Sequence, residues 1–132
     1  MGRLLVVDDA MLMRRMIRDV ATEAGWEVVG EARNGQEGVT LFTQLRPDLV
    51  TMDVVMPEMG GLEALRMIKG LDPRARVVMV TALDQKQTIE EAIRDGALDF
   101  IVKPFERDRI FSLLGKIGAL TASKATVAES DR

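Results

Sequence analysis

Short apolar runs rich in valine alternate along the chain with longer stretches in which apolar residues recur every three or four positions. The short runs are typical of buried parallel strands, and the wider spacing is typical of amphipathic helices. Glycine, proline and asparagine fall between these stretches, where they end one element and begin the next. The pattern therefore predicts five strand–helix units, with strands at residues 3–7, 27–32, 49–52, 76–80 and 98–102.

Each predicted helix has one apolar face that would pack on the sheet. The first helix follows Asp9, a candidate N-cap, and stops at Gly25. The last helix loses its periodicity after residue 118, so we expect a domain of residues 1–118 and a disordered tail at 119–132. The residues expected on the inner faces are Leu12, Met13, Met16, Ile17, Val20 and Ala24; Gly38, Leu41, Phe42 and Leu45; Leu62, Leu65 and Ile68; Ile89, Ala92 and Ile93; and Ile110, Leu113, Leu114 and Ile117.

Strands that alternate with helices through short connections favour an α/β fold, in which helices cover both faces of a parallel sheet. Right-handed crossovers restrict the topology to the doubly wound kind, a (βα)5 three-layer sandwich. Periodicity alone does not fix the strand order. In the flavodoxin-like order, 2-1-3-4-5, the first and third strands would be neighbours at the point where the winding reverses.

A reactive polar residue stands at the end of four of the five predicted strands. Asp8 and Asp9 follow the first strand, Asp53 the third, Thr81 the fourth and Lys103 the fifth. Because the carboxyl ends of parallel strands meet at one edge of a sheet, these side chains would converge there. Three acids, a hydroxyl and an ammonium group suit a Mg²⁺ ion and a phosphoryl group.

Each of these residues also has an ordinary structural explanation. An aspartate after a strand is most often a helix N-cap, and an acid before a loop rich in proline and glycine is common turn chemistry. Thr81 could cap the next helix, and Lys103 could lie in a solvated loop. Caps would be served equally well by serine, asparagine or glycine, whereas these strand ends carry a mutually compatible set. The joint placement therefore favours a functional site.

The three acids would need a cation, since two unit negative charges about 4 Å apart repel by roughly 4 kcal/mol at an effective dielectric near 20. Mg²⁺ takes one or two carboxylates together with water, a backbone carbonyl and phosphate oxygens. Attack by Asp53 on a phosphoryl donor would give an aspartyl phosphate. Lys103 would neutralise charge on the transferring group, and Thr81 would donate a hydrogen bond to it.

Composition removes several other kinds of chemistry. The 132 residues contain no cysteine and no histidine, which excludes disulfides, thiol catalysis, imidazole ligands and a histidine nucleophile. The net charge of −3 argues against a nucleic-acid surface. No apolar stretch approaches the roughly 20 residues that span a bilayer, so we expect a cytoplasmic protein without a membrane segment.

The sequence resembles the response-regulator receiver domains, and among them the stand-alone chemotaxis type. The resemblance extends from residue 3 to about 118 and is carried by VVDDA, TMDVVMPEMGG, VTA and GALDFIVKPF, each at the matching strand end. It implies the flavodoxin-like strand order and a phosphoacceptor switch of two-component signalling, with Mg²⁺ as cofactor. Such a switch is not an enzyme beyond its own autophosphorylation and autodephosphorylation.

The resemblance also implies roles for individual residues. Asp53 corresponds to the phosphoacceptor, Asp9 to a direct metal ligand, and Asp8 to a ligand that acts through water. The backbone carbonyl of Val55 corresponds to a third protein ligand, and Thr81 to the switch hydroxyl. The other implied switch residues are Lys103, which would contact the phosphate, Pro104, which would follow a cis peptide, and Phe100, which lacks the hydroxyl of the tyrosine in many relatives.

Two positions that vary in the family are apolar in this chain. Val55 stands two residues beyond Asp53, and Leu83 stands two residues beyond Thr81. Both side chains would flank the phosphoryl group, and neither could orient an attacking water. We therefore expect autodephosphorylation to be slower than in relatives with polar residues at these positions.

The phosphodonor must be another molecule, because the chain has no histidine and no phosphate-binding glycine-rich loop. A separate histidine kinase is implied. Residues 85–118 are the expected output surface toward a downstream protein, such as the flagellar motor or another effector, and we expect a monomer. The kinase-docking face would lie on the first helix, unless these residues are simply a solvated charged face: Leu12, Met13, Met16, Arg14, Arg15 and Arg18.

Two other functions fit parts of the pattern. A phosphatase of the haloacid-dehalogenase type also has an aspartate nucleophile after a strand, but it wants a second acid two residues later, where Val55 stands. An inert α/β scaffold or a nucleotide-binding module would not need three acids and a lysine, and neither a GxGxxG nor a P-loop pattern occurs. Turnover of a phosphate ester would favour the first alternative, and Mg²⁺-independent behaviour the second.

Overall fold

The computed structural model describes residues 2–82 and 86–130, and their five strands form one parallel sheet. The strand order is β2-β1-β3-β4-β5, which is the flavodoxin-like order. The predicted doubly wound α/β fold is therefore confirmed. The strands are β1 (Arg3–Val7), β2 (Glu27–Ala32), β3 (Leu49–Asp53), β4 (Val77–Ala82) and β5 (Asp99–Lys103).

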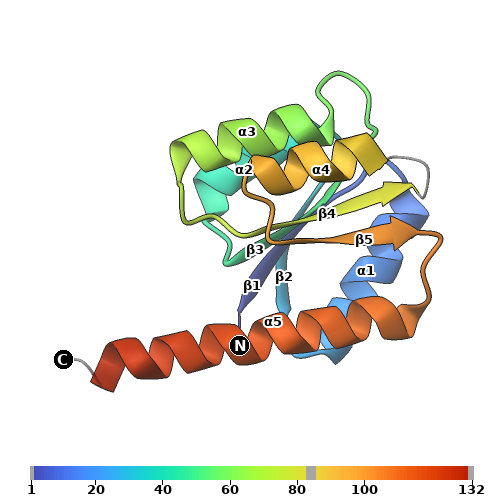
Figure 1. Cartoon of the computed structure of the whole chain (residues 1–132). Coiled ribbons are helices and arrows are strands. Elements are labelled where there is room, and N and C mark those ends of the chain that lie inside the picture. The colour runs from blue at the N-terminus through green and yellow to red at the C-terminus, as the bar shows by residue number, and fades with distance from the viewer. Residues whose placement is uncertain (1, 83–85, 131–132) are drawn as a thin grey trace.

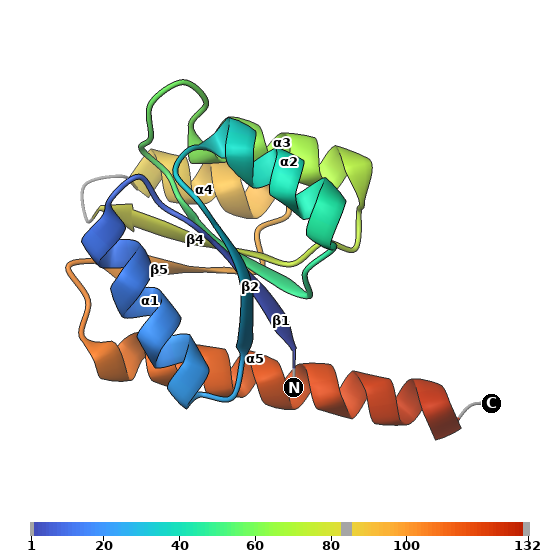
Figure 2. The same cartoon turned by 180° about the vertical axis from the view of Figure 1, so that it is seen from behind.

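Helices cover both faces of this sheet, which gives three layers. One face is covered by α1 (Met11–Glu23) and α5 (Arg107–Ser130), and the other by α2 (Gly35–Leu45), α3 (Gly61–Leu71) and α4 (Lys86–Arg94), as Figures 1 and 2 show from opposite sides. The long α5 reaches past the body of the domain at its carboxyl end (Figure 1).

Alternate residues of β1 enter two separate hydrophobic cores, because successive side chains of a strand point to opposite faces. Leu4 and Val6 pack with α1 and α5, whereas Leu5 and Val7 pack with α2 and α3. Burial on both sides explains why the strands read as continuous apolar runs.

Three strands extend further than the sequence indicates. The expected strands ended at residues 52, 80 and 102, but parallel pairing continues through the polar residues that follow. Asp53 pairs with Val80, and Ala82 pairs with Lys103. Backbone hydrogen bonding does not depend on side-chain polarity, so Asp53, Thr81 and Lys103 lie on the sheet itself, whereas Asp8 and Asp9 follow the end of β1.

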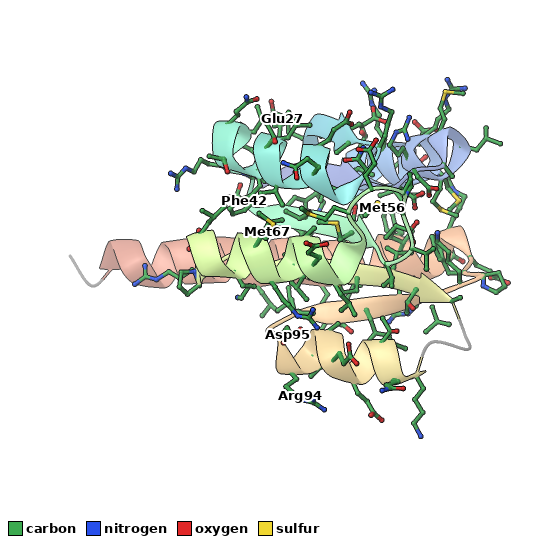
Figure 3. All side chains as sticks on the ribbon, turned by 90° about the horizontal axis from the view of Figure 1, so that it is seen from above. Glu27, Phe42, Met56, Met67, Arg94 and Asp95 are labelled. Atoms are coloured by element: carbon green, nitrogen blue, oxygen red, sulfur yellow. The ribbon has the colours of Figure 1, made fainter. Side chains whose placement is uncertain are left out.

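Helix α4 is packed less deeply than the other helices. Among its described residues only Ala92 is buried, and Ile93, which was expected on the inner face, is mostly exposed. Its carboxyl half is bound to α3 by Arg66, which forms ion pairs with Glu91 and Asp95; Figure 3 shows Asp95 between the two helices. Leu12 on α1 is likewise exposed, although the spacing placed it in the core.

Helix α5 extends past the point where the apolar periodicity of the sequence ends. Helix α5 continues to Ser130, whereas the apolar periodicity ends near residue 118. No glycine or proline follows Gly118, and alanine recurs in this segment, so local helix propensity persists after the apolar face is lost. The domain boundary at 118 and the disorder of the tail stay predictions. Within the described part of the chain, no helix combines the length and apolar character that crossing a bilayer requires.

Candidate functional site

Three carboxylates converge at the carboxyl edge of the sheet. Asp8 and Asp9 follow β1, and Asp53 ends the neighbouring strand β3. Each of the three offers an oxygen within 4.8 Å of the others. Asp8 and Asp53 are only 1% and 6% exposed, whereas Asp9 faces solvent. The cluster was predicted from the polar residues at the strand ends, and the order of the strands produces it.

Lys103 reaches these acids from the end of β5. Its Nζ lies 3.2 Å from Asp53 Oδ1 and 3.5 Å from Asp8 Oδ2. One ammonium group therefore faces two buried carboxylates, with the third acid beside them. The site carries more negative charge than its own lysine can neutralise.

This environment shifts the proton equilibrium of Asp53. Burial and, next, the negative charge of Asp8 together raise its pKa from 3.8 to about 6, against the opposing effect of Lys103. A metal-free site thus holds Asp53 partly protonated near neutral pH. A cation at the site would favour the ionised form that a nucleophile needs.

Replacing Lys103 with methionine is expected to raise the pKa of Asp53 above about 6, because the substitution removes the group that opposes the shift. Asp8→Asn is the matched control and should lower the same pKa, because it removes a like charge. The measurement is an NMR titration of the Asp53 carboxyl carbon without Mg²⁺. Shifts of the same sign in both variants would contradict this electrostatic account.

The remaining predicted residues lie around this cluster. Thr81 is buried, and its hydroxyl donates a long hydrogen bond of 3.5 Å to the Ala82 carbonyl. Phe100 is half-buried against the core beneath α2, α3 and α4. The Lys103–Pro104 peptide is cis, as the resemblance implied, and Val55 is 68% exposed. Leu83 lies outside the described residues.

A loop between β3 and α3 closes tightly behind Asp53. The Gly61 N–H donates to the Val54 carbonyl at 2.8 Å, and a Cβ on Gly61 would lie 2.1 Å from the Asp53 carbonyl oxygen. The loop is also bound to α2, because the Gly35 N–H donates to the Met59 carbonyl at 2.9 Å. Asp53 is therefore held by its strand on one side and by a closed loop on the other.

Asp8 is fixed by four separate contacts, of which only the one with Lys103 was predicted from the sequence. Besides Lys103, its Oδ1 accepts a hydrogen bond of 2.9 Å from the Ala10 N–H. Its backbone carbonyl accepts one of 2.8 Å from Arg14, and its N–H donates to Ala32. Asp9, expected as the cap of α1, does not cap that helix, whose N-cap is Ala10 with no side-chain bond. The Asp9 carboxylate is left facing solvent.

Arg14 was placed by its sequence on an exposed docking face, but the structure turns it inward. Its side chain is 12% exposed and also pairs with Glu31 of β2. Once the strand order is known, a signal for this contact exists in the sequence, because β2 neighbours β1 and Glu31 comes one residue before that strand ends. Periodicity alone could not reveal it.

The oxygen donors of this site fit Mg²⁺. The cluster consists of carboxylates, which hard cations prefer, and the described chain offers it no thiolate or imidazole. The excess negative charge and the raised pKa of Asp53 are what a divalent cation would relieve. Asp9 is exposed and does not cap α1, so its side of the site is open to solvent. Mg²⁺ could therefore keep several of its waters there.

Comparison with known proteins agrees with this geometry. Residues 4–115 match the family model of the response regulator receiver domain. The chemotaxis protein CheY of Thermotoga maritima is 49% identical over 115 residues, which are 87% of this chain and 96% of that protein. CheY of Bacillus subtilis is 49% identical over 114 residues, 86% of this chain and 95% of its own length.

Solved structures give the same result. A chain of the CheX–CheY–BeF3–Mg²⁺ complex from Borrelia burgdorferi has a TM-score of 0.83 at 31% identity, covering 87% of each chain. The receiver domain of AraT from Geobacillus stearothermophilus has a TM-score of 0.86 at 28% identity, covering 94% of this chain and 98% of that one. These similarities count against the phosphatase and scaffold alternatives. The chain belongs to the response-regulator receiver domain family, in its chemotaxis CheY type, a family of signalling switches.

Proposed function

We propose that Asp53 is the phosphoacceptor of this receiver domain. The observation that carries the proposal is the position of Asp53 at the end of β3, buried beside two further acids and 3.2 Å from the Lys103 ammonium group. An Asp53 oxygen would form the new bond to phosphorus as the donor's leaving group departs with its electron pair. The product is an aspartyl phosphate.

The neighbouring residues supply the electrostatics of this step. Lys103 is close enough to neutralise charge on the transferred group, and Thr81 on the adjacent strand β4 would donate a hydrogen bond to it. When bound, Mg²⁺ would supply further charge neutralisation. Its proposed ligands are Asp8 through water, Asp9, Asp53 and the Val55 carbonyl oxygen.

Peptide mapping tests where the phosphoryl group is attached. After treatment with acetyl phosphate and Mg²⁺, borohydride reduction converts an aspartyl phosphate to homoserine. We expect homoserine at position 53 and unmodified aspartate at positions 8 and 9. Homoserine at position 8 or 9, or none anywhere, would contradict the assignment of Asp53.

The proposed donor is a histidine kinase, and the proposed setting is chemotaxis signalling in the cytoplasm. The similarity to CheY proteins over nearly their whole length supports this. The exposed side of α1 remains the proposed docking face, with Leu12, Arg15 and Arg18 at the surface. Arg14 no longer belongs to it, because its side chain is largely buried.

We propose that phosphorylation changes the surface formed by α4, β5 and α5, to which a downstream protein would bind. The proposed surface runs from residue 85 to 118, and Gln85 lies outside the described residues. Moving a population from 1:99 to 99:1 takes about 5.5 kcal/mol, and one neutral hydrogen bond contributes roughly 1 kcal/mol. Thr81 therefore cannot drive the change alone. The charge-assisted contact of Lys103 and the repacking of Phe100 would contribute the rest.

The weak packing of α4 supports this surface as the mobile one, since Ala92 is its one buried residue among those described. Hydrogen exchange should change on phosphorylation in α4, β5 and the first turns of α5, while α2 and β2 serve as the internal control. The comparison is made on one sample with and without acetyl phosphate. Exchange that is unchanged in α4 and β5, or equally changed in α2, would contradict the proposal.

Slow autodephosphorylation is expected from the apolar side chains at positions 55 and 83. Val55 is exposed beside Asp53, where it would hinder an attacking water and could not orient it. A Val55→Asn, Leu83→Glu variant should lose phosphate faster than wild type, by about tenfold. This is less than the roughly hundredfold or more that a general acid or base contributes, because these side chains would only orient the water. The decay is followed by intact mass after the donor is removed. A variant that loses phosphate no faster than wild type would contradict this account.

A further inference from the structure

Arg14 holds the backbone of the acidic pair from behind. Its Nη1 donates a hydrogen bond of 2.8 Å to the Asp8 carbonyl oxygen, although Arg14 belongs to α1 and Asp8 to the end of β1. The guanidinium group is largely buried, with a side-chain exposure of 12%. A buried cation in this position needs a counter-charge and a fixed geometry.

Glu31 provides both. Its Oε1 lies 3.5 Å from Arg14 Nε, so the guanidinium group is held between a carboxylate of β2 and a carbonyl at the end of β1. The other oxygen, Oε2, pairs with Arg18 at 2.9 Å, but Arg18 is 57% exposed and has no contact with Asp8 among those found. Arg14 and Arg18 thus both pair with Glu31, but only Arg14 also contacts Asp8.

We infer that Arg14 is a positioning residue for Mg²⁺ binding, which it supports by fixing the Asp8–Asp9 backbone while Glu31 fixes Arg14. This inference rests on the proposed function of the acidic site. The contact also constrains Asp9, since the carbonyl that Arg14 binds belongs to the peptide bond that leads into Asp9. Groups that orient metal ligands from behind commonly contribute ten- to hundredfold in metal affinity.

Electrostatics alone predicts tighter Mg²⁺ binding after Arg14 is replaced, whereas a positioning role predicts weaker binding. The direction of the change in affinity therefore separates the two explanations. Arg14 carries a positive charge near a cation site, so removing that charge would strengthen Mg²⁺ binding if position were unimportant. A positioning role predicts weaker binding in Arg14→Met despite the lost positive charge. Arg18→Gln is the matched control. It removes one positive charge that pairs with Glu31, as Arg14→Met does, but Arg18 makes no contact with Asp8 among the contacts described.

The experiment is a calorimetric titration of each variant with Mg²⁺ alone. We expect about tenfold weaker binding in Arg14→Met, unchanged or slightly tighter binding in Arg18→Gln, and intermediate binding in Arg14→Lys, which keeps a donor for Asp8. At saturating Mg²⁺, Arg14→Met should recover most of the wild-type rate of phosphorylation by acetyl phosphate. Binding in Arg14→Met as tight as wild type, or an equal loss in Arg18→Gln, would overturn the inference.

A second measurement needs no variant and covers the case in which Arg14→Met fails to fold. The Nε–H resonances of Arg14 and Arg18 in the wild-type protein are followed by NMR during the same titration. The Arg14 resonance should shift as Mg²⁺ is added and the Arg18 resonance should not. An Arg14 resonance that does not shift would overturn the inference. If the wild type itself binds no Mg²⁺, it is the proposed function that fails.

Discussion

Replacing Asp53 with asparagine is expected to stabilise the metal-free domain above pH 6, by several degrees in its unfolding midpoint. Folding raises the pKa of this carboxyl from 3.8 to about 6, so the folded state resists its ionisation. At 1.36 kcal/mol per pKa unit, the ionised group costs on the order of 3 kcal/mol at neutral pH. Asparagine removes that cost and can still accept a hydrogen bond from Lys103.

The pH dependence of this gain follows from the sign of the shift. Below about pH 3 the carboxyl is protonated in both the folded and the unfolded state, and wild type and Asp53→Asn should unfold at similar temperatures. As pH rises from about 4 to 6, wild type loses stability and the variant does not. Adding Mg²⁺ should stabilise wild type more than the variant. A variant that is less stable than wild type at pH 7.5 without Mg²⁺ would contradict the assigned burial and repulsion at Asp53.

Replacing Gly61 with alanine is expected to destabilise the domain by roughly 3 kcal/mol and to impair the site as well. The new Cβ would meet the Asp53 carbonyl oxygen at 2.1 Å and its carbon at 2.9 Å. Both are backbone atoms, so the strand end or the loop has to move. Because Asp53 belongs to that peptide unit, Mg²⁺ affinity should fall together with stability.

Gly70 provides a control in the same helix. A Cβ on Gly70 would have nothing within 4 Å, so Gly70→Ala should stabilise the domain by about 0.5–1 kcal/mol and leave Mg²⁺ binding unchanged. Urea unfolding and Mg²⁺ titration of both variants provide the comparison. Equal stability of the two variants would show that the loop behind Asp53 is not closely packed.

Much of the fold followed from hydrophobic spacing because the sheet is buried on both faces. The five strands and the breaks between them were predicted, with errors of one or two residues at the ends of β3, β4 and β5. Those errors came from treating Asp53, Thr81 and Lys103 as strand terminators. The strand order, by contrast, came from the family resemblance, since periodicity carries no information on which strands are neighbours.

The sequence was least informative about which polar residues turn inward. Arg14 and Leu12 lie two positions apart on α1; the arginine was assigned to the surface, and the helical spacing placed the leucine on the inner face although it was also counted in the docking face. In the structure Arg14 turns inward, because a buried carbonyl and Glu31 attract its guanidinium group, and Leu12 is exposed, which agrees only with its place on the docking face. The prediction that Asp9 caps α1 was also wrong, because the sequence does not show which of the two neighbouring aspartates turns toward the start of the helix. Asp8, which was assigned only to the metal site, accepts the Ala10 N–H, while Asp9 does not cap α1 and is exposed.

The proposed chemistry depends on rigid placement. Asp53 and Lys103 lie on β3 and β5, which both pair with β4, and Asp8 makes four contacts with its surroundings. The acids therefore cannot separate to relieve their repulsion. A phosphoryl group would add negative charge to carboxylates that already repel one another, and a divalent cation would offset that charge. The site should therefore bind the two together more readily than either separately. Phosphorylation should therefore depend strongly on Mg²⁺.

The most direct test of the central claim is intact-mass analysis after incubation with acetyl phosphate, with and without Mg²⁺, on wild type and Asp53→Asn. The account predicts a gain of one phosphoryl group in wild type with Mg²⁺, little gain without Mg²⁺, and none in the variant. An equal gain without the metal, or a gain that persists in Asp53→Asn, would contradict it, as would a wild-type protein that gains no phosphoryl group.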